Sequence, residues 1–253
     1  SDVCSSDLAG NWKMHMTPRE TEAFFTALDL TEVVAHNEFI IFPPVASLAV
    51  AAACGARDPR IQLGIQNMHW EEQGAFTGET SGQIAVEAGA SFALIGHSER
   101  RHVFGETDAQ VALKVVAARR DGLIPVICVG ETLEERRAGR VDEVILRQLA
   151  AAVQALKGGE GRFLVAYEPV WAIGTGETAT PEDAAAAHAT LRAELESTIG
   201  IAAALRTPLL YGGSVNAANA ADLLAAAEVD GVLVGGASLD AMSFTGIAAA
   251  GAG

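Results

Sequence analysis

The chain has 253 residues, half of them hydrophobic, and its 17 basic and 32 acidic side chains give a formal net charge of −15. This acidity argues against a nucleic-acid partner, because nucleic-acid phosphates demand clustered lysine and arginine. No apolar run reaches the roughly 20 residues of a membrane-spanning helix, and no segment has the basic-then-apolar order of a secretory signal, so neither a membrane partner nor export is expected.

The first eight residues, Ser-Asp-Val-Cys-Ser-Ser-Asp-Leu, carry neither strand nor helix periodicity. They match the in-frame translation of a common short-read sequencing adapter, TCA GAC GTG TGC TCT TCC GAT CT followed by any base. We therefore expect residues 1–8 to be non-native, adapter-derived sequence that has replaced the start of the first strand. An ordinary polar tail is the alternative. The catalytic domain is then expected over residues 9–253.

From Ala9 onward, short apolar runs alternate with longer helical stretches. The runs are apolar throughout rather than alternating, as expected for strands that are covered on both faces. Eight strands are predicted, near Leu8–Trp12, Glu38–Phe42, Ile61–Gln66, Phe92–Gly96, Leu123–Val129, Phe163–Tyr167, Pro208–Tyr211 and Gly231–Val234. The stretches between them are rich in residues that favour helix, and they include Pro18–Leu30, Thr107–Arg120, Val141–Leu156, Pro181–Ile199 and Ala217–Ala227. Pro181 directly after Thr180 has the pattern of a helix start.

Eight strand–helix units in about 245 residues are the count and length of a single-domain (β/α)₈ barrel, an α/β fold. The competing architecture is a doubly wound open sheet. That fold usually has a glycine-rich nucleotide-binding turn after its first strand, and the sequence Ala-Gly-Asn-Trp-Lys at 9–13 is not such a turn. The barrel is therefore the predicted fold.

Polar and glycine-rich groups stand where the predicted strands end, which is where such barrels have their active sites. They are Asn11 and Lys13 after the first strand, His97 after the fourth, Glu168 after the sixth, and the turns Gly212–Ser214 and Gly235–Gly236 after the seventh and eighth. The last two turns are where such barrels commonly hold a phosphate. Each group alone has an ordinary structural explanation. Together they predict a cation, an imidazole, a carboxylate and two anion-binding turns at one end of one barrel.

Several segments resemble the signature sequences of the triosephosphate isomerase family, in that family's order and spacing. They are Asn-Trp-Lys-Met at 11–14, Ile-Gly-His-Ser-Glu-Arg-Arg at 95–101, Tyr-Glu-Pro-Val-Trp-Ala-Ile-Gly-Thr-Gly at 167–176 and Tyr-Gly-Gly-Ser-Val at 211–215. The similarity covers nearly everything after residue 8. It implies a TIM barrel that interconverts dihydroxyacetone phosphate and D-glyceraldehyde 3-phosphate in glycolysis and gluconeogenesis, with no metal and no organic cofactor.

The resemblance implies that four residues carry the chemistry. Glu168 would be the base that moves a proton between neighbouring carbons through an enediolate, and His97 would donate to the carbonyl oxygen. Lys13 would supply positive charge, and Asn11 would hydrogen-bond a substrate oxygen. As is well known for this family, enclosure is expected to raise the basicity of Glu168, and the helix that begins after His97 is expected to favour neutral imidazole.

Further residues are expected to hold the substrate or to support the four. The resemblance implies phosphate contacts from the backbone N–H groups of Gly174, Ser214, Gly235 and Gly236. Ser98 and Glu99 are expected to organise the cluster around the histidine. The segment 169–176 is expected to form a lid that closes over the phosphate and excludes water.

The family is usually a homodimer, and the sequence 75–79, Ala-Phe-Thr-Gly-Glu, is similar to its third loop. We therefore expect the loop Met68–Glu79 to insert beside the active site of a second copy. Thr77 would then reach toward Asn11 and Lys13 of that copy. A flexible surface loop is the alternative interpretation.

The three cysteines, Cys4, Cys54 and Cys128, have no metal-ligand spacing, which fits a reducing cytoplasm. Three functional alternatives remain open: another phosphate-binding barrel enzyme, a binding protein that has lost catalysis, and a chain whose altered start fails to assemble. The first would not be expected to combine these motifs, and the second would tolerate loss of Glu168 or Lys13. An isomerase assay separates all three.

Overall fold

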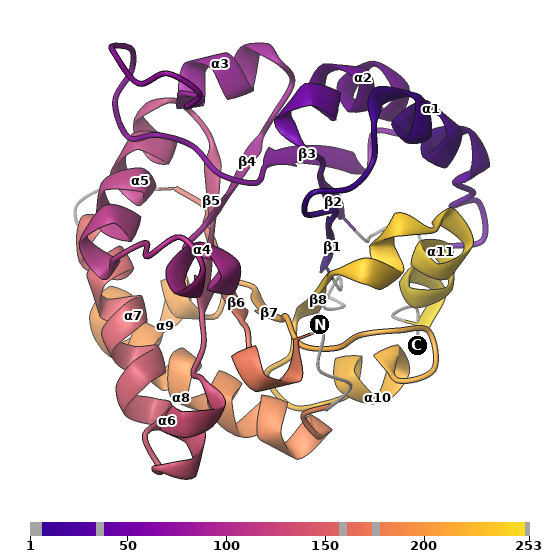
Figure 1. Ribbon diagram of the computed structural model, residues 1–253. Coiled ribbons are helices and arrows are strands. Elements are labelled where there is room, and N and C mark those ends of the chain that lie inside the picture. The colour runs from indigo at the N-terminus through magenta and orange to yellow at the C-terminus, as the bar shows by residue number, and fades with distance from the viewer. Residues whose placement is uncertain (1–6, 34–37, 157–160, 174–177, 251–253) are drawn as a thin grey trace.

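The computed structural model describes residues 7–33, 38–156, 161–173 and 178–250. Eight parallel strands form a closed barrel in which each strand pairs with its neighbours in chain order and the last pairs with the first. Figure 1 shows the strands at the centre and the helices as a ring around them. The predicted (β/α)₈ barrel is thereby confirmed.

All eight strands lie within one residue of their predicted bounds. They are β1 (Asp7–Asn11), β2 (Phe39–Phe42), β3 (Ile61–Ile65), β4 (Phe92–Ile95), β5 (Ile124–Val129), β6 (Leu164–Tyr167), β7 (Leu209–Tyr211) and β8 (Gly231–Val234). In β1, Leu8 aligns with Phe39 of β2 and with Val232 of β8. The first strand therefore pairs on both sides, and it includes Asp7 and Leu8.

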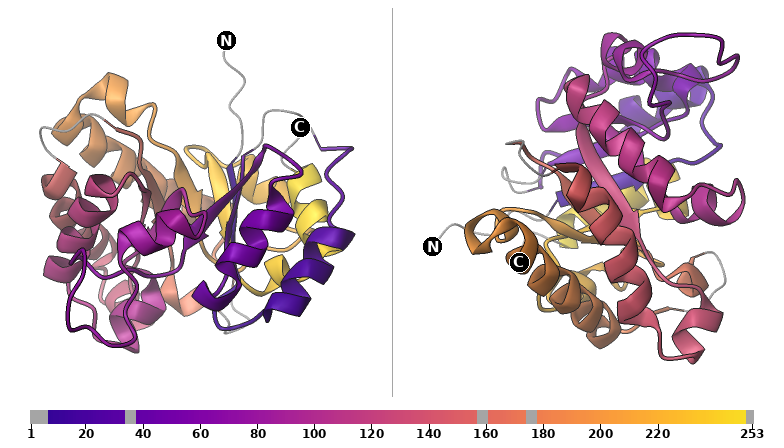
Figure 2. Two further views of the ribbon diagram at one scale, coloured as in Figure 1. Left: turned by 90° about the horizontal axis from the view of Figure 1, so that it is seen from above. Right: turned by 90° about the vertical axis from the view of Figure 1, so that its left-hand side faces the viewer.

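The helices fill the outer ring and the turns at its rim. They are α1 (Pro18–Ala27), α2 (Val45–Gly55), α3 (Gly82–Glu87), α4 (Ser98–His102), α5 (Asp108–Arg120), α6 (Leu133–Arg137), α7 (Val141–Leu156), α8 (Pro181–Ile199), α9 (Ile201–Ala204), α10 (Ala220–Leu224) and α11 (Ala241–Ala250), with the 3₁₀ turns η1 (Val170–Ala172) and η2 (Gly236–Leu239). Figure 2 shows α1 beside α2 on one flank and α5 beside α7 on another. The predicted 18–30 helix ends at Ala27, because the backbone becomes extended at Leu28.

Four helices begin at a threonine that caps them, namely α1 at Thr17, α5 at Thr107, α6 at Thr132 and α8 at Thr180. Each threonine side chain accepts the backbone N–H of the third helical residue. The side chain of that third residue, an acid or a glutamine, accepts the threonine N–H in return. The helix start predicted from Thr180 and Pro181 is confirmed.

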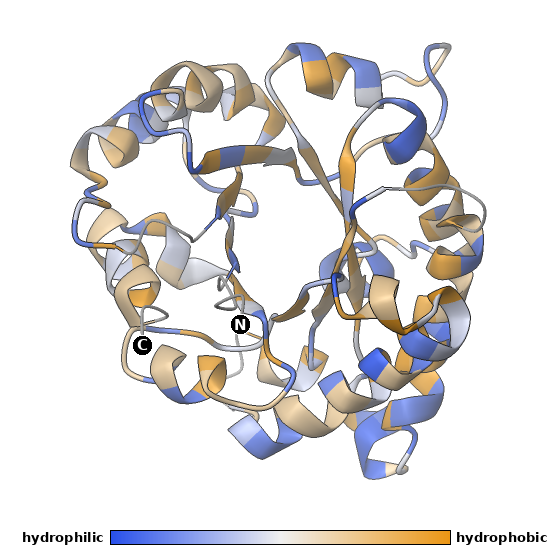
Figure 3. Ribbon diagram, turned by 180° about the vertical axis from the view of Figure 1, so that it is seen from behind, coloured by the Kyte–Doolittle hydropathy of each residue, from blue (hydrophilic) through white to orange (hydrophobic). Residues whose placement is uncertain are grey.

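The strands bury two apolar layers, because successive side chains of a strand point to opposite faces. One layer fills the barrel and consists of Ala9, Ile40, Phe42, Phe92, Leu94, Val126, Cys128, Leu164, Ala166, Leu210 and Leu233. The other lies between strands and helices, and Figure 3 shows hydrophobic residues along the strands with hydrophilic ones on the outer helix faces. The same alternation turns Asn11 and Glu168, two residues after Ala9 and Ala166, toward the barrel axis at the carboxyl end.

The amino end of the barrel buries a carboxylate at Asp7, which is only 4 % exposed. Its Oδ2 lies 3.3 Å from Nη2 of Arg162, and the same guanidinium nitrogen also pairs with Glu38. Burial raises the pKa of Asp7 from 3.8 to about 7 against the opposing charge of Arg162, and the carboxylates of Glu38 and Asp230 add to the rise. No helix in the described part of the chain is long and apolar enough to cross a membrane.

Candidate active site

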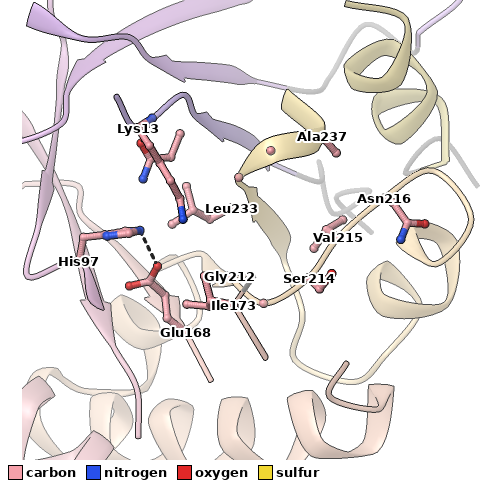
Figure 4. Close-up of a pocket in the computed structure, with 14 residues that line it drawn as sticks. Lys13, His97, Glu168, Ile173, Gly212, Ser214, Val215, Asn216, Leu233 and Ala237 are labelled. Atoms are coloured by element: carbon pink, nitrogen blue, oxygen red, sulfur yellow. Dashed lines mark hydrogen bonds and ion pairs between the residues drawn. The ribbon is translucent and has the colours of Figure 1, made fainter. Parts of the chain in front are cut away.

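A cavity of about 330 Å³ lies at the carboxyl ends of the strands. The predicted site residues that line it are Asn11, Lys13, His97, Glu168, Ser214, Gly235 and Gly236. Figure 4 shows the side chains of Lys13, His97 and Glu168 converging on one space although they follow β1, β4 and β6. Residues far apart in the sequence therefore share one small site.

Glu168 follows β6 and is held on both its backbone and its side chain. Its N–H donates to the carbonyl of Val129 (2.7 Å), and its Oε2 accepts the N–H of Ser98 (2.9 Å). Its Oε1 lies 2.9 Å from Nε2 of His97, and the carboxylate side chain is 3 % exposed. A Cβ at Gly212 would lie 2.9 Å from Cγ of Glu168. Glycine is therefore needed at position 212 for the glutamate to occupy this place.

His97 caps the amino end of α4 with its own ring. The backbone N–H of Glu99 donates to Nδ1 of His97 (3.3 Å), which directs Nε2 to carry the ring proton toward Glu168. Nδ1 of the imidazole is therefore bound by the backbone of α4, and Nε2 lies on the cavity side of the ring, beside Glu168. This is the orientation that a hydrogen-bond donor to a bound carbonyl requires.

The pKa values of these two groups depart from the sequence-based expectation. Burial acts to raise the pKa of Glu168, but the charge of His97 and the hydrogen bonds from His97 and Ser98 outweigh it, so this pKa lies below its usual value. Burial acts to lower the pKa of His97, but the carboxylates of Glu168 and Glu99 outweigh it and raise this pKa. Both directions oppose the expectation, because each of the two groups in contact favours the charged form of the other.

Lys13 has a left-handed backbone, with φ of 52°, a conformation that is uncommon outside glycine. Its N–H donates to Oδ1 of Asn11 (3.0 Å), and its ammonium lies 2.6 Å from Oε1 of Glu99. Its carbonyl accepts Nε2 of Gln66 (2.8 Å), which also donates to the carbonyl of Phe42 (2.8 Å). Sequence reasoning missed Gln66; its only signal was a polar side chain directly after β3.

The two turns of the predicted phosphate end follow the neighbouring strands β7 and β8, and both line the cavity. Gly212 and Gly213 of the first predicted turn line the cavity too. Val215, Asn216, Leu233 and Ala237 also line it and were not predicted; three of these four side chains are apolar and carry no chemical signal. Ile173 lines the cavity as well. Gly174, the remaining predicted phosphate contact, lies outside the described residues, as does the rest of 174–177.

The described start of the predicted lid contacts Glu131, a fully buried acid that follows β5. Its carboxylate accepts the hydroxyl of Tyr167 (3.0 Å) and the indole Nε1 of Trp171 (2.9 Å). The guanidinium of Arg136 lies 4.6 Å over the Trp171 ring and 3.4 Å from the same carboxylate. These contacts fix the position of η1 relative to the end of β6.

Thr77 is not brought to this cavity within one chain. It lines a different hollow, together with His69, Trp70, Phe76, Glu79 and neighbouring residues of α4 and α5. The His69 ring stacks between those of Trp70 and Phe76, at 4.3 and 4.2 Å between ring centres. The third loop is therefore ordered by its own aromatic side chains rather than by contact with Lys13 of the same chain.

The triosephosphate isomerase family model matches residues 7–251. The chain belongs to the triosephosphate isomerase family. It is 48 % identical over 242 residues to the triosephosphate isomerase of Moorella thermoacetica, covering 95 % of this chain and 96 % of that one. It is 49 % identical over 244 residues to that of Alcanivorax borkumensis (95 % and 96 %) and 44 % identical over 238 residues to that of Thermus thermophilus (94 % and 95 %). Triosephosphate isomerase activity, a step of glycolysis, is the function that this membership carries.

Proposed function

We propose that Glu168 and His97 carry out the interconversion of dihydroxyacetone phosphate and D-glyceraldehyde 3-phosphate through an enediolate. Glu168 takes a proton from the carbon next to the substrate carbonyl and returns it to the neighbouring carbon. Nε2 of His97 donates to the carbonyl oxygen as negative charge develops there. The observation that carries the proposal is the 2.9 Å contact between these groups in a cavity that Lys13 also enters.

The carboxylate must part from the imidazole to act as a base. We infer that a substrate carbonyl entering between them replaces the contact between Nε2 of His97 and Oε1 of Glu168. Once the contact between His97 and Glu168 is broken, burial is the main remaining influence on the pKa of Glu168, and burial raises the pKa of a carboxylate. The base is then stronger in the complex, and general-base catalysis of this kind contributes roughly 10²- to 10⁴-fold.

The phosphate is expected to bind at the opposite side of the cavity, on backbone N–H groups of Ser214, Gly235 and Gly236. Lys13 supplies the positive charge that this site needs in a chain with a net charge of −15. Its Nζ lies within 4.0 Å of the place where a Cβ on Gly235 would be, so one ammonium can serve both the phosphate and the developing enediolate.

The supporting roles follow from the contacts. Asn11 orients the backbone of Lys13 and faces the cavity, where its amide is available to a substrate oxygen. Ser98 holds the carboxylate of Glu168, and Glu99 pairs with Lys13. The lid over residues 169–176 is proposed to close on the phosphate with the N–H of Gly174 and to exclude water from the enediolate.

Replacing Glu168 with Asp tests the proposal. The shorter side chain keeps the charge but withdraws the carboxylate by about 1 Å, and a misplacement of this size costs roughly 10²-fold in rate. We expect kcat to fall by at least that factor in a coupled isomerase assay, with an unchanged circular dichroism spectrum. The exposed Glu22→Asp on α1 is the matched control. Wild-type turnover in E168D would exclude Glu168 as the base.

We propose further that the enzyme is a homodimer through the loop Met68–Glu79, with Thr77 reaching Asn11 and Lys13 of the second copy. Large apolar side chains exposed on the single chain support this, among them Met14 (94 % exposed), Phe76 (42 %) and Phe104 (66 %). Sedimentation velocity should give the mass of two chains, and Thr77→Arg should yield a single chain of low activity. A fully active single chain would contradict the proposal.

We also propose that residues 1–8 are adapter-derived and that the protein acts in the cytoplasm. A buried Asp7 with a pKa near 7 fits the first idea, because a carboxylate is a poor residue for the inside of a barrel. Amplifying the gene from source DNA decides it, since genomic codons for the octapeptide would contradict it. The free thiols of Cys54 and Cys128 fit the second idea, which cell fractionation with an antibody tests.

A further inference from the structure

The turn that delivers His97 to the cavity depends on a left-handed residue. Gly96, between β4 and α4, has φ of +73°, a conformation that favours glycine. Its carbonyl is the last backbone group before the histidine, so the orientation of that peptide sets the direction of the ring. A group that binds the Gly96 carbonyl therefore also fixes the orientation of the His97 side chain.

The group that holds it is the side chain of Arg101, which is 7 % exposed. Nε of Arg101 donates to the carbonyl of Gly96 (2.7 Å), and Nη1 pairs with Oδ1 of Asp108 (2.6 Å), the first residue of α5. A Cβ at position 96 would lie 2.8 Å from Nη2 of the same guanidinium. The left-handed glycine and the arginine thus fit each other closely.

The same guanidinium also reaches the strand that supports the catalytic carboxylate. Nη2 of Arg101 donates to the carbonyl of Cys128 (3.2 Å), near the end of β5. The next carbonyl, that of Val129, accepts the backbone N–H of Glu168 (2.7 Å). The guanidinium of Arg101 therefore binds both Gly96, the residue before His97, and strand β5, whose last carbonyl accepts the N–H of Glu168.

We propose that Arg101 is a positioning residue that fixes the spacing between His97 and Glu168. It is not among the residues that line the cavity, so it acts through His97 and Glu168 rather than on the substrate. Its planar fork, with donors in fixed directions, matches three acceptors on three separate elements, which the ammonium of a lysine cannot do. The proposal rests on the proposed catalytic roles of His97 and Glu168.

A purely structural brace is the alternative, and the two make different predictions. A brace would lower the stability of the barrel while leaving turnover per folded molecule intact. A positioning residue changes the placement of catalytic groups, so that kcat falls while KM, which depends on the phosphate contacts, changes little.

The experiment compares R101M and R101K with wild type in kcat and KM, both expressed per folded molecule from circular dichroism melts. R147M is the matched control, because Arg147 pairs with the other oxygen of Asp108 (2.9 Å) but is 57 % exposed and contacts neither Gly96 nor Cys128. We expect kcat to fall about 10- to 100-fold in both Arg101 variants, with KM within about threefold, and no change in R147M. The imidazole NMR signal of His97 should shift in R101K and not in R147M.

E168D is measured in parallel so that the two proposals can fail separately. Wild-type kcat per folded molecule in R101K, together with a large loss in E168D, would overturn the positioning role alone. Wild-type kcat in E168D would instead remove the proposed base. If R101M does not fold, R101K decides by the same criterion, and full activity there leaves Arg101 only a structural brace.

Discussion

We expect the buried carboxyl of Asp7, at the amino end of the barrel, to make the stability of this protein depend on pH between about pH 4 and pH 7. Folding raises the pKa of Asp7 from 3.8 to about 7, so between these values the folded chain holds a proton that the unfolded chain has released. Stability therefore falls as pH rises through this window, and the contribution of the neutral Asp7 carboxyl is lost in full above about pH 7. Asp7→Asn removes the ionisable group at nearly constant shape.

The size of the effect follows from the same two pKa values. Asp7 costs about 1.6 kcal/mol at pH 5, where folding must protonate it, and roughly 4 kcal/mol at pH 8, where it is buried with its charge, since a tenfold shift in proton affinity is about 1.4 kcal/mol. D7N should be more stable than wild type by up to these amounts. In a chain of this size the gain at pH 8 corresponds to a rise in melting temperature on the order of 10 °C.

The assay is urea unfolding followed by circular dichroism at pH 5 and pH 8, at one protein concentration for both proteins. The control is Asp222→Asn on α10, which removes one exposed carboxylate and should leave the pH dependence unchanged. Parallel stability curves for D7N and wild type between pH 5 and pH 8 would refute the reasoning, because Asp7 would then be ionised in both states or solvated in the fold.

Three further predictions concern the site. Gly212→Ala places a methyl group 2.9 Å from Cγ of Glu168, so kcat should fall about 10²-fold with little loss of stability. A wild-type kcat would show that the Glu168 side chain can move aside without loss of function. Gln66→Leu removes the donor that holds the left-handed Lys13, so KM should rise several-fold in steady-state assays; an unchanged KM would mean that other contacts suffice. Glu131→Gln takes the charge from a buried acceptor of three donors, so the free energy of unfolding should drop by about 1–3 kcal/mol in urea titrations, and an unchanged midpoint would argue against these contacts.

The residues with distinctive chemistry were predictable from the sequence, and those that support them were not. Glu168, His97 and Lys13 stand at the ends of predicted strands, and the barrel rule assigns all strand ends to one rim. Arg101 lies within a helix and carries no such mark, and Gln66 has only its place after β3, because the importance of both lies in backbone carbonyls that they reach across 27 and 53 residues. Every residue has a backbone carbonyl, so the sequence does not show which carbonyl a side chain will bind.

The ionisation of the catalytic pair could not be predicted for a related reason. Burial alone would raise the pKa of Glu168 and lower that of His97, and the helix after the ring would add to the second effect. The opposite directions in the structure come from a contact of 2.9 Å between the two groups. Contact distances of this kind depend on the register of β4 against β6 through β5, which a linear pattern does not contain.

Apolar runs, helix caps and strand-end residues determined the barrel, its order and its candidate catalytic groups, because these signals are local and depend only on neighbours along the chain. Only the closed fold decided that Asp7 would be buried beside a shared Arg162, that a glycine would be required against Glu168, and that one guanidinium would bind both the turn after β4 and strand β5. Such features arise where distant segments meet, and their energies depend on distance and burial that exist only after the barrel has closed.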